Sequence, residues 1–250
     1  ITILNSLVIT ALRGLKWNLI LSGLYHQRLS FTRIFNLMLI GQFFAFFTPA
    51  RVGDLGRAKY LKDELGYKKS FASVIVDKIF DVIAIGVFAV LGFIYMCGAL
   101  AGLVGFYLTA LILFFVLASF FCYIFRGKLM EFHLMLSDFE KKTDSKLFLE
   151  VFFLSMLIWF LTYLQFYFAV LMVNESASLL DVISLASVYT VILFLPISIN
   201  GIGVREGASA VLFPLINIRM EVGVVIAWIV AINNSLFPAV LGYISLLREK

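Results

Sequence analysis

Two segments of this 250-residue sequence place arginine beside proline and glycine within apolar stretches. The first is TPARVGD at residues 48–54, and the second is PISINGIGVREG at residues 196–207. In each segment proline stops an incoming helix and glycine permits a turn. A helix that starts after such a turn offers free N–H groups and a positive dipole end to an anion, and arginine adds a planar donor fork that suits phosphate. The pattern predicts an anion site that rests on Arg51 and Arg205, with Arg57 in support.

Several neighbouring residues are candidates for the same site. Ser198 and Asn200 could hydrogen-bond the anion, although helix capping explains both equally well. The residues expected to shape or support the site are Pro49, Gly53, Asp54, Pro196, Gly201, Gly203 and Glu206. A simpler interpretation is that proline and glycine only kink two helices, with each arginine paired to Asp54 or Glu206 as a clamp. We prefer the binding interpretation because charged groups are costly inside apolar segments.

A third charged cluster, Asp77, Lys78 and Asp81, lies near the start of a long apolar run. Asp77 and Asp81 are about one helical turn apart and share a face. They could hold the arginines of the two interrupted segments in place or take part in proton coupling. Alternatively they belong to a solvated first turn, where acids favour the helix N-terminus. The sequence leaves both interpretations open.

The remaining reactive side chains predict neither catalysis nor metal binding. His26 and His133 lie in polar stretches without cysteine or carboxylate partners at a metal-ligand spacing. Cys97 and Cys122 are isolated thiols that fit neither a metal site nor a disulfide framework. We therefore expect no catalytic residue, no metal ion and no cofactor.

The composition is that of an integral membrane protein. Apolar residues make up 62% of the chain and charged residues 14%, and the mean hydropathy is +1.04. A soluble domain has about half apolar and about a quarter charged residues. A crossing of the bilayer takes about 20 apolar residues. The runs that can cross are at residues 3–24, 71–95, 147–173 and 222–247, and the uncharged stretch 82–125 has room for a second crossing after a turn at 96–105.

Two further apolar segments are too short or too broken to cross. Residues 34–49 lie between basic loops at 26–33 and 51–69, so both ends of this segment face the same side. Residues 181–218 are broken into two short halves by the second proline–glycine segment. Backbone of this kind is tolerated at membrane depth where protein or a wet cavity surrounds it. The sequence predicts an all-α, polytopic integral membrane helical bundle with two re-entrant or discontinuous helices.

Loop charge predicts the orientation of this bundle. The basic loops are at residues 26–33, 51–69 and 126–146, with a basic tail at 248–250, whereas 96–105 and 174–181 contain no lysine or arginine. The positive-inside rule then places the basic loops and the C-terminus in the cytoplasm, in a multi-pass protein of the cell membrane. The net charge of +5 follows from these loops and does not indicate nucleic-acid binding. We expect one transmembrane domain over residues 1–250, and the start at Ile1 without a leader is consistent with a missing N-terminal span.

Two basic residues lie inside the first apolar run. Arg13 and Lys16 are three residues apart and therefore share one helix face. We expect them to face the interior of the bundle or to extend toward the lipid headgroups.

Three motifs in the chain resemble those of a known family. They are PARVGDLGRAKYL at 49–61, DKIFD at 77–81, and the second proline–glycine segment with its GVREG ending. Over nearly its whole length the chain is similar to the flippase-like membrane domain of lysylphosphatidylglycerol synthetases, a family that includes stand-alone members. That family often has Glu-Arg or Asp-Arg where this chain has Asp77 and Lys78. The resemblance implies a polytopic domain that moves an anionic or aminoacylated lipid between leaflets, without the soluble aminoacyltransferase domain.

The leading hypothesis is a lipid translocase for an anionic phospholipid or a polyprenyl-phosphate-linked lipid. Its headgroup would enter a polar cavity between the two interruptions and meet Arg51 and Arg205. A rival is a membrane-embedded transferase with Asp77 and Asp81 as base or metal ligands, which would form product in detergent without a second leaflet. A third hypothesis is a non-catalytic partner of a lipid synthase. The expected partners are a membrane lipid with an anionic headgroup and either a second copy of the chain or a lipid synthase.

Overall fold

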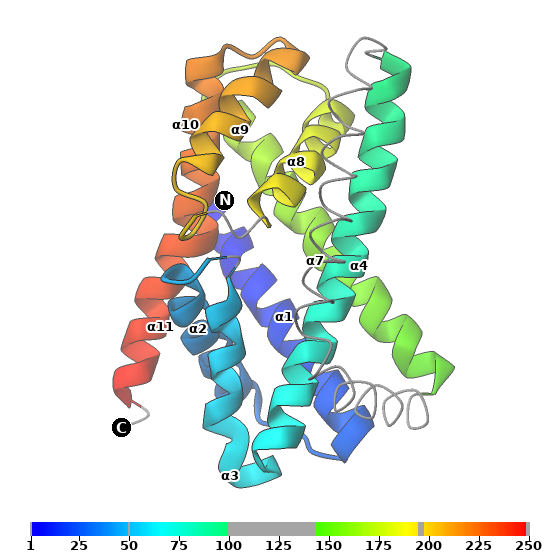
Figure 1. Ribbon diagram of the computed structural model, residues 1–250, viewed down its shortest axis with the longest axis vertical. Helices are drawn as coiled ribbons and strands as arrows, with labels where there is room; N and C mark the ends of the chain where they lie inside the picture. The colour runs from blue at the N-terminus through cyan, green and yellow to red at the C-terminus, as the bar shows by residue number, and fades with distance from the viewer. Residues whose placement is uncertain (1, 50, 100–143, 195–197, 249–250) are drawn as a thin grey trace.

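The computed structural model describes residues 2–49, 51–99, 144–194 and 198–248. This part of the chain forms a bundle of helices elongated along one axis (Figure 1). The longer α-helices are α1 (Thr2–Tyr25), α2 (Phe31–Phe46), α4 (Tyr67–Ala99), α7 (Ser145–Met172), α8 (Leu179–Leu193), α9 (Val204–Leu212), α10 (Met220–Ala231) and α11 (Phe237–Arg248). The short helical turns between them are η1 (Val52–Leu61), α3 (Lys62–Leu65), η3 (Phe213–Ile216) and η4 (Ile232–Leu236).

Long apolar helices confirm the predicted polytopic all-α membrane bundle. Among the described residues four segments are long and apolar enough to cross a membrane: Thr2–Tyr25, Tyr67–Met96, Ser145–Met172 and Met220–Arg248. The last of these runs from α10 through one π-helical turn, η4, into α11. Helix α4 continues to Ala99, beyond the turn expected from residue 96. The second predicted crossing in 82–125, the loop at 126–146 up to residue 143, Cys122 and His133 lie outside the described residues.

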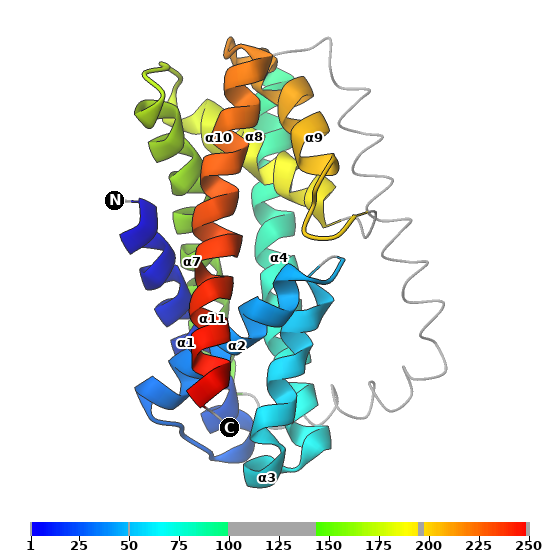
Figure 2. The ribbon, with the colours of Figure 1, turned by 90° about the vertical axis from the view of Figure 1, so that its left-hand side faces the viewer.

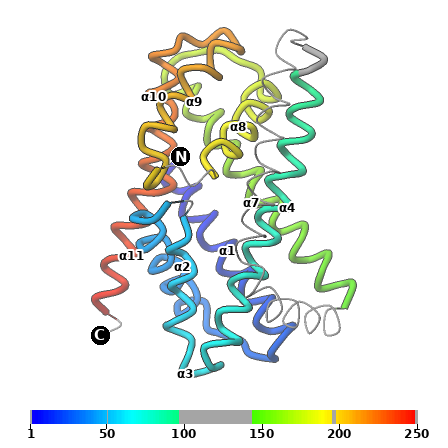
Figure 3. Tube along the Cα trace, viewed as in Figure 1, coloured from blue at the N-terminus to red at the C-terminus, as the bar shows by residue number. Residues whose placement is uncertain are grey.

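Two short helical hairpins occupy the positions of the predicted interruptions. Helix α2 has 16 residues and α8 has 15, so each is about 24 Å long or less, too short for the roughly 30 Å hydrocarbon core. Helix α2 rises from the lower end in Figure 1, turns near mid-height and returns as η1. Helix α8 descends from the upper end, turns near the same height and returns as α9. The turned view in Figure 2 and the trace in Figure 3 show the same opposed arrangement.

The basic connections gather at one end of the molecule. The C-terminal end of α1, the short helix α3 and the end of α11 lie at the lower end in Figure 1. The connection from α7 to α8 and the start of α10 lie at the opposite end, as Figure 2 also shows. Residues 26–33, the short helix α3 and the end of α11 are therefore on one side of the bundle, and residues 174–181 are on the other. The expected basic loop at 51–69 is wrong for its first part, because residues 52–61 form η1, which runs from the tip near mid-height down to α3 with Asp54 and Arg57 buried.

Each hairpin packs in an apolar cluster of its own. Around the α2–η1 hairpin, the buried residues include Trp17, Leu37, Met38, Leu61 and Val74. A larger cluster surrounds the α8–α9 hairpin and draws residues from α4, α7 and α10. Glycines allow close approach at both places, because a Cβ at Gly242 of α11 would overlap the backbone of α2 and one at Gly92 of α4 would crowd α8. The hairpin tips are thus held at a fixed height by long helices.

Candidate functional site

The tips of the two hairpins meet. Pro49 of the first tip and Ile199 of the second form an isolated antiparallel β-bridge. Arg51 adopts a left-handed conformation with φ 57° just after this contact. On the other side, Asn200, Gly201 and Gly203 also have positive φ, of 51°, 76° and 84°, which turns the chain into α9 within a few residues. The two predicted interruptions are therefore adjacent in space.

The backbone of the first tip satisfies its own hydrogen bonds. The Gly53 N–H donates to the Thr48 hydroxyl at 2.7 Å. The N–H groups of Arg51 and Asp54 donate to the carbonyls of Thr48 and Arg51, at 3.3 and 3.2 Å. The helix that follows is a 3₁₀-helix, whose tighter turns use these donors. The expectation that free N–H groups bind an anion is therefore wrong for these three donors. The Arg51 side chain is the remaining donor at this tip that an anion could contact.

At the second tip, Glu206 caps its own helix. Its Oε2 accepts the Gly203 N–H at 2.7 Å, and the Arg205 N–H donates to the Gly201 carbonyl at 2.7 Å. Arg205 is 6% exposed, and its Nη2 donates to the Asn200 carbonyl at 2.8 Å. Its guanidinium also lies 5.7 Å from the ring of Trp228. Among the described residues no ion pair joins Arg205 to Glu206, so the clamp that was the simpler interpretation is absent here.

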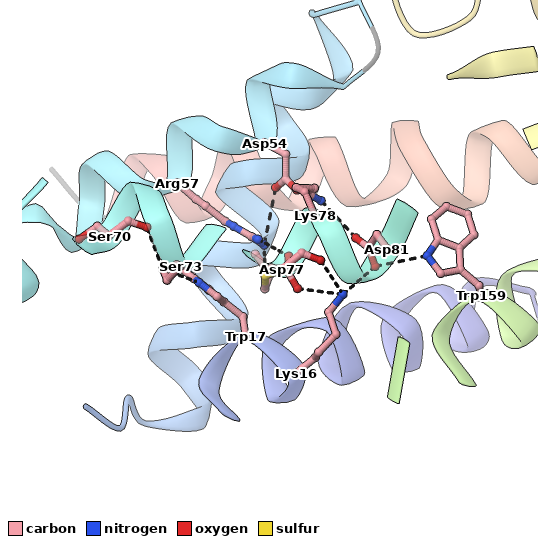
Figure 4. A network of polar contacts seen from close by, with 11 residues as sticks. Lys16, Trp17, Asp54, Arg57, Ser70, Ser73, Asp77, Lys78, Asp81 and Trp159 are labelled. Atoms are coloured by element: carbon pink, nitrogen blue, oxygen red, sulfur yellow. Dashed lines mark hydrogen bonds and ion pairs between the residues drawn. The ribbon is translucent and has the colours of Figure 1, made fainter. Parts of the chain in front are cut away.

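A network of buried charges lies beside the first tip (Figure 4). Lys16 of α1 contacts Asp77 Oδ1 at 2.9 Å and Asp81 Oδ1 at 2.6 Å, and its side chain is fully buried. Arg57 of η1, also fully buried, pairs with Asp77 Oδ2 at 2.5 Å and lies 3.8 Å from Asp54. This network therefore joins the first hairpin to α1 and α4.

Lys78 of α4 completes this network from its edge, with a side chain that is 37% exposed. Its Nζ forms ion pairs with Asp54 and, at 3.5 Å, with Asp81. Three cations, Lys16, Arg57 and Lys78, are thus matched by three carboxylates, Asp54, Asp77 and Asp81. We call these six residues the balanced network. Its net formal charge is zero.

Two tryptophans border the balanced network. The Trp17 ring lies 4.4 Å from the Arg57 guanidinium, and its indole N–H donates to Ser73 at 3.0 Å. Trp159 of α7 donates its indole N–H to Asp81 Oδ1 at 3.3 Å. Arg57 also donates to the Met38 sulfur. Arg57 is therefore held by Asp77, Met38 and the Trp17 ring, although its Nε has no hydrogen-bond partner among the described residues.

Three other arginines lie near the tips without a matching acid. Arg51 is half-buried, and the charges that act on it include those of Arg13 and Arg205 as well as Asp54 and Asp81. Arg13 of α1 lies 5.7 Å from the Trp159 ring. No ion pair in the described part of the chain involves Arg13, Arg51 or Arg205, and Asp54 and Asp81 are already matched within the balanced network. We call these three residues the arginine triad. With Glu206, which caps α9 at the second tip and has no ion pair among the described residues, the tips carry a net formal charge of +2.

Unsatisfied polar atoms accompany the arginine triad. The Arg13 Nε and the Ser198 hydroxyl are buried and have no hydrogen-bond partner among the described residues. Ser198 directly precedes Ile199, the residue that bridges to Pro49. Buried polar groups are hydrogen-bonded in the great majority of cases. Other buried side-chain atoms share this state, among them Arg57 Nε and the Ser155 hydroxyl, and at the tips it coincides with cations that have no ion pair.

The structure separates the sequence-predicted residues into two sets. Arg51, Arg205, Ser198 and Asn200 gather at the tips, whereas Arg57, Asp54, Asp77, Lys78 and Asp81 form the balanced network with Lys16. The solvated-turn interpretation of Asp77 and Asp81 is wrong, because α4 already begins at Tyr67 and the two residues are 1% and 5% exposed. Pro196 lies outside the described residues. No cluster of metal-ligating side chains occurs in the described ranges.

Sequence reasoning did not assign three of these residues to the site. Arg13 and Lys16 were expected only to face the interior or extend to headgroups, and Trp159 was not considered. The sequence contained a weak indication for Arg13 and Lys16, because two cations on one face of an apolar helix must find partners or line a polar space. The sequence could not show that one of them would be paired and the other left free.

The match to a protein family covers both clusters. A family described as the lysylphosphatidylglycerol synthase TM region matches residues 1–242. No curated protein and no solved structure matches the chain.

Proposed function

Because the chain belongs to the family of the lysylphosphatidylglycerol synthase transmembrane region, whose members handle lipids in membranes, we propose that it translocates a lipid with an anionic headgroup between leaflets. The headgroup binds between the hairpin tips on Arg51 and Arg205, while its hydrocarbon tails stay in the bilayer. The bilayer is the cell membrane, and the basic end of the bundle, with the C-terminus, faces the cytoplasm.

The observation that carries this proposal is the unbalanced charge of the arginine triad at mid-height in the bundle. An ionised group without a partner is expensive at membrane depth. An anionic ligand removes that cost, and guanidinium groups bind phosphate with paired hydrogen bonds. Both hairpins turn near mid-height in the bundle (Figure 1), and a site at that depth suits transport.

The balanced network has a supporting role in this function. Asp54 and Asp77 hold Arg57, which fixes η1 and hence the direction of the Arg51 side chain at its start. The ion pairs that these carboxylates form also argue against the transferase alternative. Asp77 and Asp81 are engaged by Lys16 and by other cations of the network, which leaves them poorly placed to act as a base or as metal ligands.

The test is an Arg51→Gln, Arg205→Gln double variant in proteoliposomes. Each glutamine removes a charge-assisted hydrogen-bonding group worth about 1.5–3 kcal/mol, so translocation of an acyl-labelled anionic lipid is expected to fall at least tenfold per arginine. The rate is measured by dithionite quenching of the label in the outer leaflet. Thermal stability is expected to fall only slightly, since no ion pair is lost and the contacts removed include the Arg205 hydrogen bond to the Asn200 carbonyl and its contact with Trp228.

Arg219→Gln is the matched control, because Arg219 is exposed at the far end of the bundle before α10. It is expected to leave transport unchanged. Undiminished translocation by the folded double variant contradicts the proposed site.

A further inference from the structure

The two charged clusters differ in a way that bears on the identity of the headgroup. The balanced network cancels its own charge, whereas the arginine triad does not. The contrast is clearest on α1, where Arg13 and Lys16 share a face. Lys16 contacts two carboxylates, and Arg13 has no acid partner among the described residues. The charge surplus is therefore confined to the tips.

Arg13 is held in a position to bind a ligand. The Trp159 ring lies 5.7 Å from its guanidinium carbon, and the indole N–H of Trp159 is fixed on Asp81. The balanced network thereby holds the aromatic surface against which Arg13 lies. Arg13 Nε is buried without a partner among the described residues. The Trp159 ring also packs on Phe194, with ring centroids 6.3 Å apart, where α8 leads into the second tip, and the charge of Arg13 acts on Arg51 of the first tip. These contacts place a third guanidinium at the site.

We propose that Arg13 completes a three-guanidinium site with Arg51 and Arg205 that selects a lipid headgroup with at least two negative phosphate charges, a phosphomonoester or a diphosphate. This inference rests on the proposed function and narrows its substrate. Since Glu206 offsets one of the three cations, a phosphodiester headgroup with one negative charge leaves one positive charge unbalanced. An aminoacylated headgroup adds an ammonium group and repels the triad. A doubly charged phosphate leaves no surplus charge and has enough oxygens for several guanidinium edges.

The Ser198 hydroxyl supplies an independent reason for a phosphate with free oxygens. It is buried at the second tip without a partner, beside the bridge between Ile199 and Pro49. A hydroxyl group can donate to a phosphate oxygen that the guanidinium groups do not reach. A phosphomonoester has three terminal oxygens, whereas a phosphodiester has two.

The test compares two lipids in binding to the full chain in neutral nanodiscs at pH 8. The probes are short-chain phosphatidic acid, a phosphomonoester, and phosphatidylglycerol with the same acyl chains, a phosphodiester. We expect the wild-type protein to bind phosphatidic acid at least tenfold more tightly. Arg13→Gln is expected to reduce this preference to about threefold or less, and Arg13→Lys to give an intermediate preference, because lysine keeps the charge but loses the fork. Arg219→Gln again serves as the control and keeps the full preference.

Three outcomes overturn the inference. Equal binding of the two lipids by the wild-type protein refutes the selectivity, whether or not the variants fold. An unchanged preference in folded Arg13→Gln removes Arg13 from the site. Displacement of the probe by inorganic phosphate at the same concentration as phosphatidic acid overturns the assignment to a lipid headgroup.

Transport measurements separate this inference from the proposed function. If phosphatidylglycerol is bound and translocated as well as phosphatidic acid, the selectivity is wrong and the translocase function stands. If phosphatidic acid binds selectively and neither lipid crosses the bilayer, the site stands and the translocase function is wrong.

Discussion

Asp77→Asn is expected to destabilise the protein strongly, although it changes only one atom of the side chain. The Asp77 carboxylate lies 2.9 Å from Lys16 Nζ and 2.5 Å from Arg57 Nη2. Both cations have side chains that are 0% exposed. An asparagine amide keeps the size of the carboxylate and removes its charge, so the balanced network is left with a net charge of +1.

The size of the effect follows from the contacts that remain. Breaking a buried ion pair by removing one partner costs about 3–5 kcal/mol. Lys16 keeps Asp81 at 2.6 Å, and Arg57 keeps the more distant Asp54 at 3.8 Å. Because both cations retain some compensation, we expect the lower part of that range, about 3 kcal/mol. This is a large fraction of the roughly 5–15 kcal/mol that stabilises a folded domain.

A double-mutant cycle with Lys16→Gln isolates the role of charge. Lys16→Gln alone leaves the network at −1, whereas the Lys16→Gln, Asp77→Asn pair returns it to zero. The pair is therefore expected to be less destabilised than the sum of the single changes, by about 1–3 kcal/mol. The free energy of unfolding is measured by denaturant titration in mild detergent, with tryptophan fluorescence as the signal.

Lys146→Gln provides the comparison at the surface. Lys146 lies 3.9 Å from Glu150, and its side chain is 81% exposed, so its loss is expected to cost about 0–1 kcal/mol. The reasoning is refuted if the effects of Lys16→Gln and Asp77→Asn are additive. It is also refuted if Asp77→Asn costs no more than Lys146→Gln.

Two further changes probe the geometry around the tips. Gly41→Ala is expected to lower the free energy of unfolding by about 1–3 kcal/mol, because its Cβ would overlap the Asp54 carboxylate. Gly86→Ala is the control, because a Cβ there meets no atom within 4 Å. Equal thermal stability of the two variants contradicts the packing argument. Cysteines at Pro49 and Ile199, in a background without the native cysteines, are expected to form a disulfide under mild oxidation, since bridged residues have Cα atoms about 4.5–5.5 Å apart. Failure to cross-link, seen as free thiols by mass spectrometry, contradicts the meeting of the tips.

The fold could be predicted well because its signals are local. The apolar runs gave the four described crossings within a few residues, since hydrophobic length alone decides whether a helix can span a bilayer. Proline and glycine identified both hairpins. The positions of the ends were less certain: α4 starts at Tyr67, about one turn before the expected start at residue 71.

The division of charge could not be predicted because it depends on contacts between distant segments. Arg57 and Arg51 lie in one motif, yet only Arg57 points to Asp77, 20 residues further along the chain. Lys16 meets Asp81 across a separation of 65 residues. The expectation of free N–H groups at the tips failed because the Thr48 hydroxyl and the Glu206 carboxylate accept some of them. The spacing of residues in the sequence does not predict these side-chain hydrogen bonds.

The balanced network is better explained by positioning than by stability. Buried ion pairs contribute little net stability compared with well-packed apolar residues, because removing the charges from water is costly. The value of this network lies in the groups that it orients: Arg57 fixes the helical turn that follows Arg51, and Asp81 fixes the Trp159 ring beside Arg13. Fixed donors bind an anion without the entropy cost of ordering them first. In the proposed site, a charge-balanced framework of this kind keeps the unpaired guanidinium groups in fixed positions for the headgroup.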